Sequence, residues 1–216
     1  MANRALLPFL IVLVAWCGVA VGLMVGSSQL ELHLRINGSL PQWADPIFVY
    51  GTHIADGYLT AVIALVLLWR NWRSMILVGG ASLLSSLVVQ SLKRGVFEAH
   101  RPGYFREQMP GLRVPDGIEL MQHFSFPSGH STAAFALCLS VALLINQRGW
   151  AVALAVLAVL LAGSRVWLSQ HFTEDVVAGA LLGTLTAWFA YVLLFGTWRN
   201  VRWMDRSPFS RMLPPR

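Results

Sequence analysis

Residues 150–168 read WAVALAVLAVLLAGSRVWL, and no charged side chain occurs in this stretch before Arg165. A helix needs about 20 mostly apolar residues to cross a bilayer, so the stretch predicts a transmembrane helix. The apolar residues are continuous and do not alternate, which favours a helix over a barrel strand. Ionisable groups at a membrane boundary are costly unless they are used or paired, so Arg165 indicates a functional site at this end.

Five further apolar stretches have the same character. They cover residues 6–24, 47–69, 74–92, 131–145 and 176–195. The six stretches together predict an all-α, polytopic membrane protein that forms a six-transmembrane-helix bundle. Of the 216 residues, 56% are hydrophobic and 12% charged, about half the charged share of a soluble domain. Because no linker or composition shift divides the chain, we expect a single membrane-embedded domain over residues 1–216.

The positions of the basic residues predict the orientation in the membrane. With the N-terminus inside, nine basic residues face the cytoplasm: Arg4, Arg70, Arg73, Arg148, Arg199, Arg202, Arg206, Arg211 and Arg216. The other seven face outward, which agrees narrowly with the positive-inside rule. We therefore expect an integral protein of a bacterial inner membrane with both termini in the cytoplasm. This basic edge accounts for the net charge of +6, so anionic lipid headgroups and not nucleic acid are the expected partners.

Three polar segments interrupt the apolar pattern at the predicted outer face. They read KRGVFEAHRP at 93–102, FPSGHST at 126–132 and SRVWLSQHFTED at 164–175. They supply four cations, two histidines and a carboxylate, namely Lys93, Arg94, Arg101, Arg165, His130, His171 and Asp175. Arginine forks match phosphate oxygens, and lysine adds a point charge. The helix start at Ser128 and Gly129 offers unpaired N–H groups, so the segments predict a phosphate-binding site.

The two histidines are the candidate catalytic groups. His171 and Asp175 are four residues apart and share a face if a helix has begun there. A carboxylate on one ring nitrogen leaves the other nitrogen as a lone pair, which makes His171 a candidate nucleophile. His130 lies on a different element and could protonate the leaving oxygen. Taken singly, a Ser-Gly-His turn is more often a helix cap, Arg165 a snorkelling arginine, and His171 with Asp175 a structural hydrogen bond. The combination of these groups on one face favours a site.

These segments closely resemble the signature of the type 2 phosphatidic acid phosphatase superfamily. That signature reads Lys-x6-Arg-Pro, Pro-Ser-Gly-His and Ser-Arg-x5-His-x3-Asp, and the resemblance covers roughly residues 46–195. The second and third blocks match in full. The first departs, because seven residues separate Lys93 from Arg101, whereas Arg94 has the family spacing. Either Lys93 reaches across one extra residue or Arg94 replaces it.

The resemblance implies a six-helix bundle and metal-independent hydrolysis through a phosphohistidine. It makes His171 the nucleophile, Asp175 its orienting carboxylate and His130 the general acid. The phosphate oxygens would be held by Lys93 or Arg94 together with Arg101, Ser128, Gly129 and Arg165. Soluble vanadium haloperoxidases share this signature, but the hydropathy of the chain argues against a soluble enzyme.

The expected function is therefore hydrolysis of a lipid phosphate or diphosphate. Candidate substrates are undecaprenyl diphosphate, phosphatidylglycerophosphate, phosphatidic acid and a lipid A phosphate, with the polyprenyl diphosphate preferred. The alternative is a phosphotransferase that passes the same phosphate to a lipid acceptor. A metal site built on His100, His123, His130, His171 and Asp175 has no common ligand spacing, so no metal or cofactor is expected. A non-catalytic lipid carrier is the remaining alternative, and it would have no use for the nucleophile, the acid and the cations.

Two features near the expected site have less defined roles. His53 and Asp56 lie three residues apart in the outer part of the second apolar stretch. Ionisable residues in a span are functional candidates, and these two either support a cationic residue as its partners or only line water. The loop over residues 103–126 mixes apolar and charged residues, which favours an interfacial flap that guides a lipid tail.

Overall fold

The computed structural model describes residues 3–39 and 41–210, and all regular structure in these ranges is helical. The α-helices are α1 (Leu6–Val25), α2 (Gln29–Asn37), α3 (Asp45–Gly51), α4 (Gly57–Leu67), α5 (Trp72–Gly95), α6 (Gly129–Ile145), α7 (Arg148–Trp167) and α8 (Thr173–Tyr191). The shorter elements are 3₁₀ turns at Gln42–Ala44, Thr52–Ala55, Pro102–Gln108 and Arg202–Asp205, and a π-helical turn at Val192–Thr197 that continues α8. The predicted all-α class is confirmed.

Four helices are long and apolar enough to cross a membrane. They are α1, α5, α7 and α8 with its π-helical extension. The predicted second span, 47–69, is wrong as a continuous helix, because the chain bends by 50° between the α3 segment and α4. Asp56 causes the break, since its extended backbone cannot continue either helix. The bent pair gives a fifth candidate crossing, and α6 is a shorter apolar helix of 17 residues.

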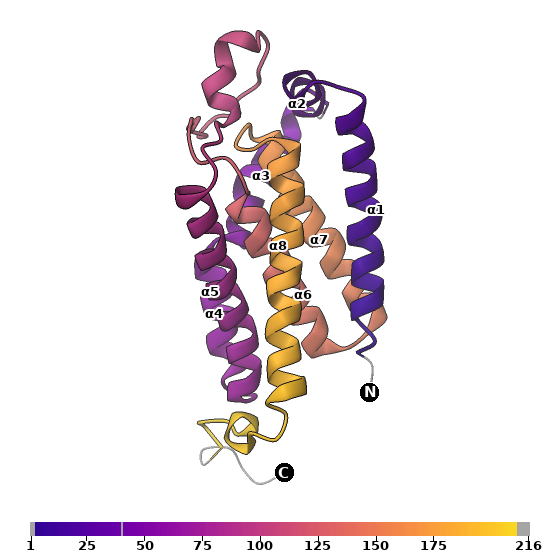
Figure 1. The fold of residues 1–216 in the computed structure, drawn as a ribbon, viewed down its shortest axis with the longest axis vertical. Helices are drawn as coiled ribbons and strands as arrows, with labels where there is room; N and C mark the ends of the chain where they lie inside the picture. Colours follow the sequence, from indigo (N-terminus) through magenta and orange to yellow (C-terminus); the bar gives the residue numbers. More distant parts are fainter. Residues whose placement is uncertain (1–2, 40, 211–216) are drawn as a thin grey trace.

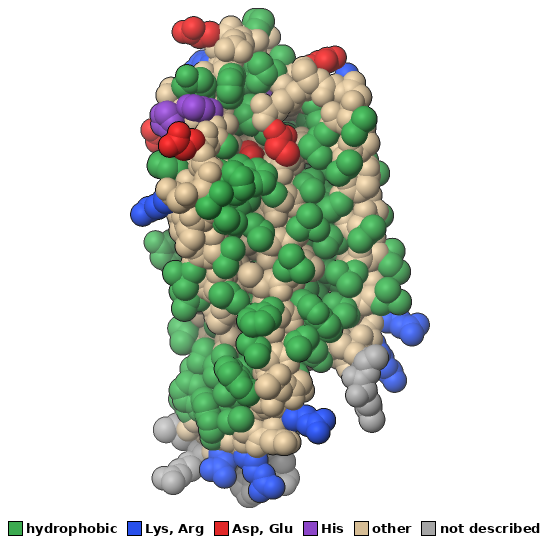
Figure 2. Space-filling model, in the orientation of Figure 1, with side chains coloured by type: hydrophobic (Ala, Val, Ile, Leu, Met, Phe, Trp, Pro, Cys, Tyr) green, Lys and Arg blue, Asp and Glu red, His purple; other side chains and the backbone are tan. Residues whose placement is uncertain are grey.

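Helix α6 lies at the centre of the bundle. It contacts α1, α5, α7 and α8, and in Figure 1 the long helices run roughly parallel to one axis around it. Phe135, Leu139 and Ala142 of α6 are fully buried, and Phe9 of α1 meets Phe135 edge-on at a centroid distance of 6.1 Å. Outward faces of the bundle instead expose leucine and valine, such as Leu83 and Leu185. Figure 2 shows hydrophobic side chains along the length of the visible face, as expected of a surface that faces lipid tails.

Helices α6 and α8 come close together at two glycines of α8. A methyl group added at Gly179 would lie 2.4 Å from the Ser128 carbonyl oxygen, and one at Gly183 would lie 2.2 Å from that of Thr132. Both distances are shorter than any real contact, so only glycine permits this approach. The sequence analysis did not single out these two glycines. They set the first turns of α6 and α8 side by side.

The two ends of the bundle differ in charge. In Figure 2 the visible Lys and Arg side chains lie mainly at the lower end, and the acidic and His side chains gather at the upper end. Arg4, Arg70 and Arg148 are exposed, whereas Arg73 is buried and pairs with Asp205 at 2.7 Å. Two residues of the predicted basic edge, Arg211 and Arg216, lie outside the described residues. The long joins at the upper end contain α2 and the Pro102–Gln108 turn, which the sequence analysis did not predict.

We expect Gly183→Ala to destabilise the protein, because its methyl group must push α6 away from α8. Overpacking of this kind costs about 1–3 kcal/mol, which corresponds to a melting temperature lower by roughly 3–10 °C for a chain of this size. Thermal unfolding of the purified protein in detergent measures the change. Gly18→Ala in α1 is the matched control, because nothing lies within 4 Å of the added methyl group. Equal melting temperatures for the two variants would contradict the close-contact argument.

Candidate active site

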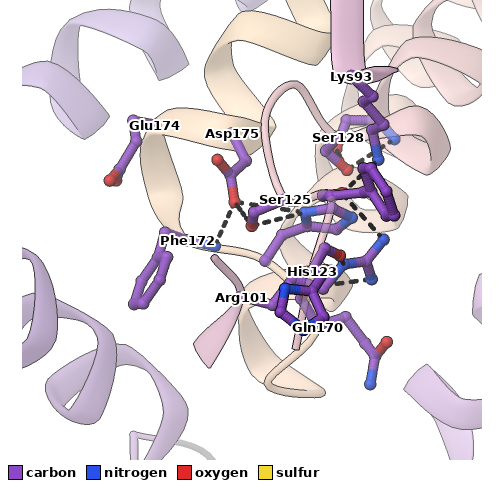
Figure 3. A network of polar contacts seen from close by, with 12 residues as sticks. Lys93, Arg101, His123, Ser125, Ser128, Gln170, Phe172, Glu174 and Asp175 are labelled. Carbon is purple, nitrogen blue, oxygen red and sulfur yellow. Dashed lines mark hydrogen bonds and ion pairs between the residues drawn. The ribbon is translucent and has the colours of Figure 1, made fainter. Parts of the chain in front are cut away.

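A buried polar cluster lies at the upper end of the bundle. It forms where α5 and α7 end, where α6 and α8 begin, and where residues 123–125 pass between them. Figure 3 shows Lys93, Arg101 and Asp175 converging on this short segment. All three polar segments of the sequence therefore meet in one place. The sequence analysis had put them at the same face of the membrane.

His171 is at the centre of the cluster and is only 1% exposed. Its Nδ1 atom lies 3.3 Å from Asp175 Oδ2. The same carboxylate oxygen accepts hydrogen bonds from the Phe172 N–H at 2.9 Å and from the Ser125 hydroxyl. A proton on Nδ1 that points to this carboxylate leaves a lone pair on Nε2, and Nε2 has no hydrogen-bond partner among the described residues. This arrangement orients the His171 ring and leaves its Nε2 atom without a proton.

The charged groups of Lys93 and Arg101 point into the cluster. Lys93 Nζ donates to the Phe124 carbonyl at 2.9 Å. Arg101 donates to the carbonyls of His123, at 2.9 Å, and of Phe124 and Gln170. These partners are neutral, so both charges remain available to an anion. Arg94, the alternative for the first block, is exposed on the outer surface of α5, and the structure does not bring it into the cluster.

Arg165 reaches the cluster from the last turn of α7 and is 7% exposed. Its Nη1 atom donates to the Thr52 hydroxyl at 2.8 Å, but its Nε atom is buried without a hydrogen-bond partner among the described residues. Most buried donors are satisfied, so this guanidinium N–H is available to an anion. Thr52 belongs to the broken second span, and no sequence signal marked it.

The first turn of α6 offers backbone donors. The Ser128 side chain caps the helix by accepting from the Ser131 N–H, and the Ser128 N–H donates to the Asp175 carbonyl at 2.9 Å. Within the described chain, the N–H groups of Gly129 and His130 have no partner. A methyl group at Gly129 would meet only Val89, at 3.9 Å, so protein packing does not require glycine there. The space in front of these donors suits an anion.

His130 begins the same helix and faces a second carboxylate. Its Nε2 atom lies 3.1 Å from Asp56 Oδ1, and Asp56 Oδ2 lies 2.7 Å from His53 Nδ1. The structure thus joins the two candidate supporting residues, His53 and Asp56, to a histidine instead of directly to a cation.

The electrostatic environment favours neutral histidine at the centre and a bound anion beside it. Burial lowers the pKa of His171 well below its usual value, and the nearby charges of Arg101, Lys93 and Arg165 lower it further. Burial also lowers the pKa of Arg101, which Asp175 partly offsets. Among the described residues, no group of three or more His, Cys, Asp and Glu side chains is placed to hold a metal ion. The three buried cations fit a phosphate group.

Helix α2 supports the turn that carries His171, a role the sequence analysis missed. The Asn37 amide donates to the Trp167 carbonyl at 2.8 Å and to the Ser169 hydroxyl, and it also pairs with the backbone of Arg113. His33 packs on Phe172, and burial lowers its pKa to about 4, so its ring is neutral. The i, i+4 spacing of His33 and Asn37 was the available signal.

Two cavities of about 250 Å³ reach His130 from different directions. One lies between α4, α5 and the start of α6, and hydroxyl side chains such as Thr60, Ser82 and Ser85 line it. The other opens outward between the Thr52–Ala55 turn and Gly117–Glu119 of the predicted flap, and it also reaches Arg165. The Gln170 side chain holds this part of the flap by donating to the Glu119 carbonyl at 2.9 Å. Part of segment 103–126 therefore lines the site.

Comparisons with known proteins show which family the chain resembles. Residues 74–199 match the PAP2 superfamily. The chain is 28% identical to the undecaprenyl-diphosphatase BcrC of Bacillus subtilis over 145 residues, 65% of this chain and 70% of that protein. It is 36% identical to a lipid A 1-phosphatase of Rhizobium johnstonii over 107 residues, 49% of this chain. The first curated relatives are matched over only 41% of their length.

The fold also resembles a solved structure. The crystal structure of LpxE from Aquifex aeolicus superimposes with a TM-score of 0.66 and 23% sequence identity, over 76% of this chain and 94% of that one. At this identity the likeness concerns the fold alone.

Lys93→Ala is expected to weaken the binding of inorganic phosphate, whereas Arg94→Ala is expected to leave it unchanged. Lys93 is buried in the cluster and Arg94 is exposed, and a hydrogen bond to a charged group contributes about 1.5–3 kcal/mol. The dissociation constant of phosphate should therefore rise roughly 10- to 100-fold in the Lys93 variant alone. Calorimetric titration of the purified proteins measures it. A larger loss in the Arg94 variant would make Arg94 the cation of the first block.

Proposed function

Because the chain belongs to the PAP2 superfamily, we propose that it is an integral membrane phosphatase. In this proposal it hydrolyses the phosphate monoester or diphosphate of a membrane lipid, forms a phosphohistidine and requires no metal. The observation that carries the proposal is the arrangement around His171. A buried neutral imidazole is held by Asp175 and lies among the charges of Lys93, Arg101 and Arg165.

The first half of the reaction transfers the phosphoryl group to the enzyme. His171 Nε2 attacks phosphorus, so an N–P bond forms while the bond from phosphorus to the lipid oxygen breaks. Asp175 stabilises the positive charge that develops on the ring. The three cations and the N–H groups of Gly129 and His130 neutralise the phosphoryl oxygens, which is the main task in phosphoryl transfer. His130 gives its proton to the departing oxygen.

The second half returns the enzyme to its starting state. His130, now neutral, takes a proton from a water molecule that attacks the phosphohistidine. The N–P bond breaks, inorganic phosphate leaves, and both histidines recover their first protonation states. The outward cavity beside His130 and Gly117–Glu119 is a route for that water.

We place the site at the extracytoplasmic face of a bacterial cytoplasmic membrane. The proposal uses six crossings, with α3–α4 as one broken span and α6 as a short one. The exposed arginines at the opposite end of the bundle (Figure 2) support this orientation. Helix α6 is about 25 Å long at 1.5 Å per residue, shorter than the roughly 30 Å hydrocarbon core. A site at its start would therefore lie near the depth of lipid headgroups.

The lipid that we propose is undecaprenyl diphosphate. The relative with the broader of the two reported matches is named an undecaprenyl-diphosphatase. The cluster of three cations also suits a whole diphosphate group, which carries more negative charge than the phosphate monoesters among the candidate lipids.

His171→Ala should abolish phosphate release from lipid substrate, because no other group can form the intermediate. With substrate labelled in its terminal phosphate, rapid alkaline quenching of the unaltered protein should trap label on the protein, since an N–P bond survives alkali and is lost in acid. The variant should trap none, and excess chelator should not reduce turnover of the unaltered protein. Turnover by His171→Ala would refute the nucleophile assignment.

A panel of four lipids tests the substrate. We expect the highest kcat/KM for undecaprenyl diphosphate, above phosphatidylglycerophosphate, phosphatidic acid and lipid A phosphate. Phosphate release by the purified protein in detergent is the measurement, and one phosphate should appear for each substrate molecule consumed. A deficit of free phosphate, with label in a second lipid, would instead identify a phosphotransferase.

A further inference from the structure

The break in the second apolar segment carries a carboxylate into the candidate active site. Helices α3 and α4 meet at 50°, and Asp56 sits at the junction in an extended conformation. A continuous helix over these residues would satisfy more backbone hydrogen bonds, which is strongly favoured within a membrane. The break therefore needs a compensating role, and the partners of Asp56 indicate one.

Asp56 does not perform the usual task of an aspartate at the start of a helix. It occupies the N-cap position of α4, where an aspartate normally accepts a hydrogen bond from the first turn. Its side chain makes no such bond. One carboxylate oxygen instead lies 3.1 Å from His130 Nε2 and the other lies 2.7 Å from His53 Nδ1. Both oxygens of the carboxylate are thus committed to histidines.

His130 otherwise faces positive charge. Arg165 on α7 and Arg101 before the flap both act on it electrostatically, with Asp56 as the opposing negative group. His130 in turn acts on His171 electrostatically, and the carboxylate that contacts His171 is Asp175. In residues 3–39 and 41–210, Asp56 is the single carboxylate that contacts His130. Without it, the cations that hold phosphate would oppose a protonated imidazole.

We propose that Asp56 is the positioning residue of His130 in the reaction proposed above. It accepts a hydrogen bond from the Nε2–H group, which fixes the ring and leaves Nδ1 as the nitrogen that gives its proton to the lipid oxygen and later takes one from water. Its negative charge keeps that proton on the ring until the leaving group needs it. His53, whose side chain is 66% exposed, holds the second carboxylate oxygen. The inference rests on the proposed hydrolysis, because a general acid is needed only there.

Asp56→Asn tests this role, because the amide has the same shape but no charge. For dioctanoyl phosphatidic acid, whose alkoxide must be protonated, kcat should fall about 10- to 100-fold, part of what a general acid contributes. For 4-nitrophenyl phosphate, whose phenolate leaves without a proton, kcat should change less than about threefold. The alkaline limb of the kcat/KM profile with the lipid should also move about one pH unit or more toward acid, since an adjacent carboxylate favours the charged imidazole.

Glu98→Gln is the matched control. Glu98 is exposed and does not line the outward cavity, and its side chain makes no hydrogen bond or ion pair with the described residues. Removing its charge should leave both substrates and the pH profile unchanged. Equal melting temperatures of the variants and the unaltered protein in detergent would exclude a folding defect.

The outcomes separate this inference from the proposed function. If the unaltered protein hydrolyses lipid but Asp56→Asn slows both substrates equally and keeps the same alkaline limb, Asp56 only supports the fold or the phosphate site, and the inference is overturned. If Asp56→Asn has unaltered activity on the lipid, the inference is also overturned. If the unaltered protein releases no phosphate from any lipid, the proposed function itself fails.

Discussion

The close contact between α6 and α8 is the constraint on which the candidate active site depends. Gly179 and Gly183 let the α8 backbone touch the carbonyl groups of Ser128 and Thr132. At that distance the Ser128 N–H reaches the Asp175 carbonyl. The donors at the start of α6 and the carboxylate that orients His171 are therefore fixed relative to each other by backbone atoms. Backbone contacts vary less than side-chain contacts, and a phosphoryl-transfer site requires that precision.

Charge balance explains why so many polar groups tolerate burial together. Lys93, Arg101 and Arg165 are buried, and isolated buried charges are strongly unfavourable. Most of their donors face backbone carbonyls, and the two carboxylates, Asp175 and Asp56, are each bonded to a histidine. The cluster keeps an excess of positive charge, which suits an anionic ligand. Burial lowers the pKa of His171 and the same excess lowers it further, so the groups proposed to bind the anion also help to keep the proposed nucleophile neutral.

The sequence predicted the parts of this structure that depend on local pattern. Hydropathy predicted the long helices because their apolar runs are continuous. The predicted crossings put Arg165, His130 and His171 at the same membrane face, so the sequence also predicted that they would meet. It could not choose between Lys93 and Arg94, because that choice depends on which side of the last turn of α5 faces the bundle. It missed Ser125, Thr52 and the α8 glycines, whose roles arise from tertiary contacts. The sequence analysis did not predict the bend at Asp56, because the apolar residues on both sides of it have the pattern of one continuous span.

The signature blocks supply only part of the candidate active site, and this bears on selectivity for the lipid. In the proposed reaction, the three signature blocks supply the groups that hold and attack the phosphoryl group, which is the same in every phosphate ester, and they also supply His130 as the acid. Other residues that line the cavity at His130 come from outside the blocks: Thr52 and Asp56 from the broken span, and Gly117–Glu119 from segment 103–126. The leaving group is what distinguishes one lipid phosphate from another. Relatives named for different lipids are then compatible with one phosphoryl site, and selectivity for the lipid should depend on the segments between the blocks.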